Sequence, residues 1–142
     1  MTGPTYDLER FVEAQDAGGT YDRALVELRR GRKASHWMWF VFPQVAGLGR
    51  SATAQRYAVS GLAEARAYVA HPVLGPRLQE CATALTELPG SDPVAVLGPV
   101  DAVKLHSSMT LFARADPAEP TYAAVLEQYF AGTPDESTLR LL

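Results

Sequence analysis

The sequence has little of what marks an exported or membrane-bound protein. Cys81 is the only cysteine among 142 residues, so the chain can form no internal disulfide and no all-cysteine metal cluster. No uninterrupted apolar run approaches the ~20 residues of a membrane-spanning helix. The first residues carry neither the basic nor the apolar stretch of an export signal. We therefore expect a cytoplasmic protein without a membrane partner.

The chain also lacks an overall positive charge. It contains 13 lysine and arginine residues against 16 acidic residues, which gives a net charge of −3 and argues against nucleic acid as the partner. The local distribution differs, because Arg29, Arg30, Arg32 and Lys33 lie within five positions. These cations either balance the negative end of a preceding helix or bind an anion.

Several familiar functional motifs are missing. Gly47-Leu-Gly49 is too short for a dinucleotide fingerprint, and no phosphate-binding loop or nucleophile elbow is present. His71 and His106 have no second ligand at helical spacing, so we expect no metal site and no cofactor. No linker rich in serine and glycine and no internal repeat divides the chain. We expect a single domain over residues 1–142.

What is present is a series of short helix signals. Glycine and proline fall between segments whose apolar residues recur every three to four positions, a pattern typical of a compact, multi-helical, mainly α fold. Residues 36–43 are ambiguous, because their aromatics suit either a helix or a short extended segment. The expected helix starts are marked by Thr5, Thr20, Ser60, Gly75-Pro76, Gly98-Pro99 and Asp135.

The first segment that indicates function covers residues 30–44 and contains basic side chains, a histidine, both tryptophans and a glutamine. Arg32 and Lys33 could donate charge-assisted hydrogen bonds to an anion, and a tryptophan could supply a flat stacking surface. The structural alternative is that Trp37 packs in the core together with Phe40 and Phe42.

The second segment covers residues 101–112, which we expect to be helical. On a helix, Lys104, Ser107 and Ser108 share an arc of about 100°. A serine hydroxyl beside a desolvated lysine is one arrangement for a nucleophile and its base. Alternatively, the hydroxyls are small packing groups bonded to the backbone, and Lys104 is paired with Asp101 one turn earlier.

The whole chain resembles an uncharacterised bacterial family, domain of unknown function 1810. The resemblance is carried by residues 6–11, 30–44, 47–51, 71–78 and 104–112. It implies a small helical fold and supplies no reaction. Members sometimes carry the label calpastatin, but inhibitors of that kind are disordered and do not have the apolar core expected here.

Two classes of function fit these segments. One is a pocket for an anionic small molecule, such as a nucleotide or an ADP-ribose-like compound, with hydrolysis as one outcome. The other is a non-catalytic module that contacts a protein or nucleic acid through residues 29–44. The sequence does not decide between enzyme and binding protein, nor does it give the oligomeric state. The candidate catalytic residues are Lys104, Ser107, Ser108 and His36, and the candidate ligand-binding residues are Arg32, Lys33, Trp37, Trp39, Gln44, His106 and Thr110.

Overall fold

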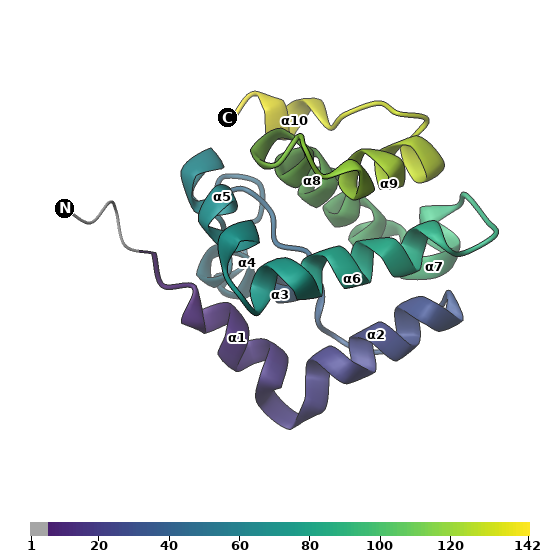
Figure 1. Ribbon diagram of the computed structural model, residues 1–142, viewed down its shortest axis with the longest axis horizontal. Coiled ribbons are helices and arrows are strands. Elements are labelled where there is room, and N and C mark those ends of the chain that lie inside the picture. The colour runs from purple at the N-terminus through teal and green to yellow at the C-terminus, as the bar shows by residue number, and fades with distance from the viewer. Residues whose placement is uncertain (1–5) are drawn as a thin grey trace.

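The computed structural model describes residues 6–142, and within that range the chain is helical and contains no strand (Figure 1). This confirms the expected mainly α fold. No helix in this range is both long and apolar enough to span a membrane. The elements are α1 (Glu9–Asp16), a 3-10 turn η1 (Ala17–Gly19), α2 (Thr20–Arg30), α3 (Met38–Val41), α4 (Ala52–Arg56), α5 (Leu62–Ala70), α6 (Leu74–Thr86), α7 (Pro93–Leu97), α8 (Pro99–Ala115), α9 (Pro120–Phe130) and α10 (Glu136–Leu139).

Two helices, α6 and α8, form the centre of the molecule. Helix α6 crosses the view of Figure 1 and packs against α2, α5 and α9, while α8 packs against α5, α7, α9 and α10. The apolar spacing of α6 buries Leu78 and Leu85, and that of α8 buries Leu105, Met109 and Phe112. Apolar side chains three and four positions apart share a helix face, so each stripe reaches the core as the sequence predicts.

Glycine permits a left-handed helix end at one position and a close approach between two helices at another. Gly31 ends α2 at φ 76°, a left-handed conformation in which the amide of Arg32 reaches the carbonyl of Glu27 (3.1 Å). A Cβ at Gly75 would lie 2.1 Å from the carbonyl oxygen of Val69, so α6 can approach the end of α5 only because this residue has no side chain.

The expected helix starts need several corrections. Thr20 opens α2 but is not its N-cap, because its hydroxyl donates to the carbonyl of Ala17 (2.6 Å). Helix α5 begins after Gly61 and not after Ser60. Helix α6 begins at Leu74, before Pro76, with the His71 ring accepting from the amide of Leu74 (3.2 Å). The starts at Pro99 and Asp135 are confirmed, whereas the predicted cap at Thr5 lies outside the described residues.

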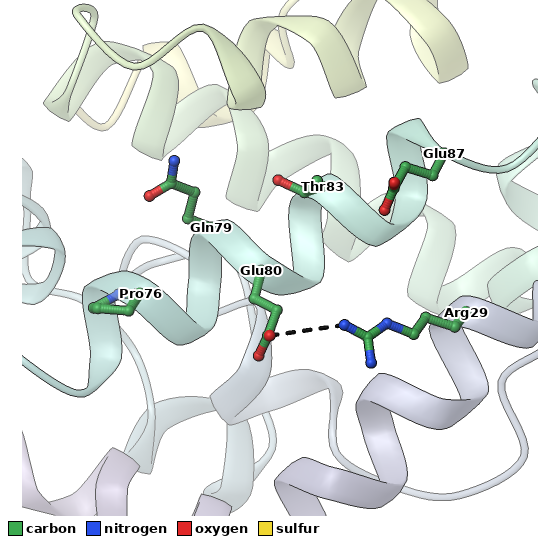
Figure 2. A pocket seen from close by; sticks show the side chains of 6 residues that line it. All are labelled: Arg29, Pro76, Gln79, Glu80, Thr83 and Glu87. Atoms are coloured by element: carbon green, nitrogen blue, oxygen red, sulfur yellow. Dashed lines mark ion pairs between the residues drawn. The ribbon is translucent and has the colours of Figure 1, made fainter.

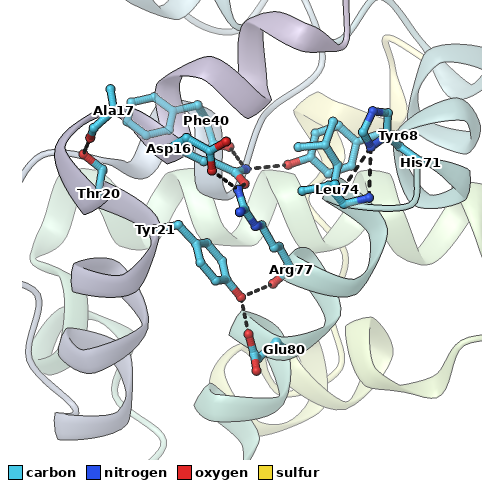
Figure 3. Close-up of polar contacts among 12 residues, drawn as sticks. Asp16, Ala17, Thr20, Tyr21, Phe40, Tyr68, His71, Leu74, Arg77 and Glu80 are labelled. Carbon is cyan, nitrogen blue, oxygen red and sulfur yellow. Dashed lines mark hydrogen bonds and ion pairs between the residues drawn. The ribbon is translucent and has the colours of Figure 1, made fainter.

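Residues 36–43 contain the short helix α3 and no extended strand. A buried glutamine fixes this helix, since Gln15 Nε2 donates to the carbonyl of Phe40 (2.8 Å) and to the hydroxyl of Tyr68 (3.3 Å). Arg77 holds Gln15 in turn, through a contact of 3.2 Å to its Oε1, and pairs with Asp16 at 2.8 Å. Figure 3 shows Arg77 directed toward Asp16. Phe40 follows Trp39 in α3, so this network restrains the backbone next to Trp39.

Candidate functional site

The two segments that the sequence singles out meet at one aspartate. Lys33 Nζ lies 2.9 Å from Asp101 Oδ2, and Lys104 Nζ lies 3.5 Å from Asp101 Oδ1. The backbone supports this meeting, because the amide of Lys33 donates to the carbonyl of Val96 at the end of α7 (2.7 Å). We refer to Lys33, Asp101 and Lys104 as the lysine cluster.

The lysine cluster is poorly solvated. The side chains of Lys33, Asp101 and Lys104 are 10%, 16% and 19% exposed. Partly buried charges are screened less by salt and water than surface charges. One carboxylate faces two ammonium groups, so the cluster holds one positive charge that no cluster member balances.

Each lysine of the cluster also lies over a tryptophan. Lys33 Nζ is 5.1 Å from the ring centre of Trp37, and Lys104 Nζ is 4.7 Å from that of Trp39. Both distances allow attraction between the cation and the ring face. Trp37 is fully buried, as the alternative of a core tryptophan predicts, whereas Trp39 keeps part of its surface exposed.

A hollow of about 400 Å³ opens beside Lys104. Most of its walls are apolar, and Lys104 is the only charged residue among the described residues that line it. Two of the lining residues, Val100 and Val103, are 66% and 64% exposed, which is unusual for large apolar side chains. The hollow is lined by Gln44, Leu48, Gly49, Pro99, Val100, Val103 and Lys104.

A buried carboxylate positions the loop that carries Lys33. Glu27 is 5% exposed and accepts hydrogen bonds from the amides of Ala34 (2.7 Å) and Ser35 (3.0 Å). It also accepts from the hydroxyl of Ser35 (2.6 Å) and from Trp37 Nε1 (2.9 Å). Burial raises the pKa of Glu27, but the bonds from Ser35, Ala34 and Trp37 outweigh it and lower this pKa to about 2. The carboxylate is therefore ionised and acts as a structural anchor.

Two of the predicted site residues on α8, His106 and Thr110, face a different part of the protein. His106 stacks on Phe130 at 4.2 Å between ring centres, and its Nε2 lies 2.7 Å from the carbonyl of Thr133. Thr110 accepts from the amide of Asp135 (2.9 Å) and donates to the carbonyl of His106 (2.8 Å). These contacts attach the segment between α9 and α10 to α8.

The two serines are buried and do not line the hollow. Ser107, 1% exposed, shares a hydrogen bond of 2.8 Å with the hydroxyl of Thr138 in α10. Ser108 is fully buried, and its Oγ has no hydrogen-bond partner among the described residues. The bond of Thr110 to the carbonyl four residues earlier is the backbone bond that the structural alternative predicts for such hydroxyls.

The remaining predicted residues divide between the hollow and the surface. Gln44 lines the hollow together with Lys104. His36 and Arg32 are exposed, and neither lines this hollow or the two others, which lie along α6 and beside Gly31. The structure thus brings Lys33, Trp37, Trp39, Gln44 and Lys104 into one region and leaves the other candidates elsewhere.

Two further hollows have no residue of the lysine cluster in their lining. One, of about 380 Å³, is an open groove along α6, where Glu80 points toward Arg29 at 3.7 Å while Gln79 and Thr83 stand on another side of the helix (Figure 2). The other, of about 290 Å³, lies beside Gly31 and Tyr129. Neither gathers charged side chains as closely as the lysine cluster.

Metal and thiol chemistry find no support in residues 6–142. No group of three histidine, cysteine or acidic side chains in that range is placed to hold a metal ion. Burial raises the pKa of the Cys81 thiol to about 12, so the thiol stays protonated and unreactive at neutral pH.

Sequence reasoning missed Glu27 and the apolar lining of the hollow. The sequence did contain a signal for Glu27. Helical spacing places it at the edge of the apolar stripe formed by Ala24 and Leu28, where a buried carboxylate needs hydrogen-bond partners. The exposed Val100 and Val103 could not be found in this way, because the sequence alone does not say which side of α8 another helix covers.

Comparisons with known proteins agree with the fold and add no activity. The family described as "Protein of unknown function (DUF1810)" matches residues 5–142. The crystal structure of the conserved hypothetical protein Rv1873 from Mycobacterium tuberculosis is similar, with 50% identity, a TM-score of 0.93 and 96% of each chain covered. No curated protein matches the sequence. The extent of these matches shows that the chain belongs to the DUF1810 family of proteins of unknown function.

Proposed function

We propose that this protein binds a small anionic molecule in the hollow beside Lys104. The observation that carries the proposal is the lysine cluster, in which Asp101 balances only one of two poorly exposed ammonium groups. An incompletely balanced charge at low exposure is costly, and an anion from solution would offset that cost. Nucleotides and ADP-ribose-like compounds are members of this ligand class.

The surroundings of Lys104 suit a ligand with an apolar or aromatic part. Its ammonium has three donors, so it can contact an anion while it remains paired with Asp101. The exposed Val100 and Val103 would be covered by the apolar part, which favours binding through the hydrophobic effect. Gln44 adds an amide that both donates and accepts, and such a group orients a ligand.

Binding is better supported than hydrolysis. A serine nucleophile needs a hydroxyl that reaches the substrate, whereas Ser107 is buried against Thr138 and Ser108 is fully buried. His36 lines none of the three hollows, and His106 is engaged with Phe130 and the Thr133 carbonyl. The arrangement offers an anion a cation, an amide and an apolar wall.

A small molecule also fits better than a nucleic acid. Of the four basic residues at 29–33, Arg29 faces Glu80 at 3.7 Å and Lys33 faces Asp101 at 2.9 Å. A surface that binds nucleic acid gains affinity from cations that are free to meet phosphates. Here two of the four cations already have carboxylate partners within the protein.

The test is a thermal-shift screen against nucleotides, ADP-ribose derivatives, small phosphorylated metabolites and aromatic carboxylates. A ligand at 100 times its dissociation constant stabilises the folded state by about 2.7 kcal/mol. The variant Lys104→Met should abolish this stabilisation and change the stability of the free protein by less than about 1 kcal/mol, because methionine can still pack on Trp39.

The matched control is Arg114→Met, which removes an exposed cation from the same helix. It should leave the ligand shift unchanged. A ligand that stabilises Lys104→Met as much as the wild-type protein would place its binding site elsewhere and refute the proposal.

A further inference from the structure

The net charge of the lysine cluster beside the hollow restricts the ligand further. Lys33 and Lys104 contribute two positive charges and Asp101 one negative charge, so one additional negative charge brings the cluster to neutrality. Lys104 is the only charged residue among the described residues that line the hollow. A second negative charge on a ligand would therefore find no cation of its own in this lining.

The apolar walls of the hollow also favour a ligand with a single charge. Leu48, Pro99, Val100 and Val103 offer a multiply charged group no hydrogen-bond donors from their side chains. No arginine, whose planar fork suits phosphate, lines the hollow within residues 6–142. A volume of about 400 Å³ lies at the lower end of the range for ligand pockets, which is roughly 300–1,000 Å³.

We infer that the hollow selects a singly charged anion attached to an apolar or aromatic body, and that Asp101 sets this selectivity. The inference rests on the proposed function, since it narrows the ligand of the same site. Asp101 neutralises one of the two lysines and so limits the anionic charge that the cluster accepts to one. A compound with several phosphate groups, such as a nucleoside triphosphate or ADP-ribose, would retain uncompensated charge against an apolar wall, so these members of the anionic class should bind more weakly than a singly charged one.

Three probes of similar size test the inference in the wild-type protein. Phenylacetate carries one negative charge, phenylacetamide none, and phenyl phosphate close to two at about pH 8. Isothermal titration calorimetry should give phenylacetate an affinity about tenfold higher than that of phenylacetamide, because a charge-assisted hydrogen bond to Lys104 is gained. Phenyl phosphate should bind no tighter than phenylacetate.

The variant Asp101→Asn tests the role of the aspartate. It preserves the shape of the side chain and raises the net charge of the cluster from one to two. The ratio of phenyl phosphate to phenylacetate affinity should rise by about tenfold. Asp22→Asn, which alters an exposed aspartate on α2, is the control and should leave the ratio unchanged.

The outcomes separate the two proposals. If phenyl phosphate binds the wild-type protein about tenfold tighter than phenylacetate, the selectivity for one charge is wrong while anion binding stands. If folded Asp101→Asn has the same ratio of phenyl phosphate to phenylacetate affinity as the wild-type protein, Asp101 does not set the selectivity. If neither charged probe binds better than phenylacetamide, the anion site itself is refuted. Should Asp101→Asn fail to fold, the wild-type affinities still decide the selectivity.

Discussion

Helix α8 carries two sets of polar side chains with different surroundings. His106, Ser107 and Thr110 have neutral partners in the segment from Thr133 to Thr138. Asp101 and Lys104 lie at the other end of the helix, where charged groups meet a hollow and one positive charge is left over. A polar residue within a helix can thus serve folding or binding, and the chain packed against it decides which.

The largest expected effect concerns the anchor beneath the lysine cluster. Glu27→Ala would leave the indole N–H of Trp37 and two backbone amides without their carboxylate partner. We expect a loss of about 3 kcal/mol in the free energy of unfolding, measured by urea titration. The control Glu87→Ala removes an exposed carboxylate and should change stability by less than about 0.5 kcal/mol.

Equal stabilities for these two variants would show that Glu27 does not hold the loop. In that case, Glu27 could not be counted among the polar residues whose role is to stabilise the fold.

Acid unfolding should report the same anchor. The pKa of Glu27 is about 2 in the folded protein against an ordinary 4.5, so the unfolded chain binds the proton more tightly. Stability from this group is present above about pH 4.5 and is lost as the pH falls toward about 2. Between about pH 6 and about pH 3 the loss should be about 2 kcal/mol.

Other carboxylates titrate in the same range, so the measurement is the difference between the wild-type protein and Glu27→Ala. The variant should lose less stability on acidification than the wild type. Parallel curves for the two proteins would contradict the lowered pKa.

A smaller effect is expected at the C-terminal side of α8. Thr110→Val keeps the shape of the side chain and removes the hydroxyl that accepts from the Asp135 amide. Stability should fall by about 1 kcal/mol, and amide hydrogen exchange should rise in residues 133–138. Ligand binding in the hollow should not change.

The control for Thr110→Val is Thr53→Val, because Thr53 is exposed on α4 and its hydroxyl has no partner among the described residues. Weakened ligand binding in Thr110→Val, without a matching loss of stability, would assign Thr110 to the hollow. The folding and binding residues of α8 would then not lie at separate ends of the helix.

Much of this fold follows from local signals. The stripe of Leu78 and Leu85 and that of Leu105 and Met109 predict buried helix faces, because helical spacing alone determines which side chains share a face. The helix starts are less predictable. The His71 ring accepts from the amide of Leu74 at the start of α6, and such a cap cannot be distinguished in sequence from a surface histidine.

The candidate site is predictable only in part. Lys33, Trp39, Gln44 and Lys104 stand out by residue type and do lie together. His106, Ser107 and Thr110 have the same appearance in sequence, but their partners lie more than twenty residues away. Long-range partners depend on tertiary packing, which helical periodicity does not report.

The smallest expected effect comes from two neighbouring serines. Ser108 Oγ is buried without a partner among the described residues, so Ser108→Ala removes a group that gains nothing from folding and adds a better helix former. We expect stability to stay equal or to rise by up to about 0.5 kcal/mol. Ser107→Ala removes one of the two partners of the Thr138 hydroxyl, which also contacts a carboxylate oxygen of Asp135, and should instead cost up to about 1 kcal/mol.

Urea titrations of Ser107→Ala and Ser108→Ala measure the difference directly, because the residues are adjacent, chemically identical and both buried. A loss of about 1 kcal/mol or more in Ser108→Ala would mean that a bound water or ligand atom contacts its hydroxyl. Ser108 lies one helical turn after Lys104, on the side of α8 that bears the lysine cluster. That result would therefore add Ser108 to the residues of α8 that serve binding, one helical turn beyond Lys104.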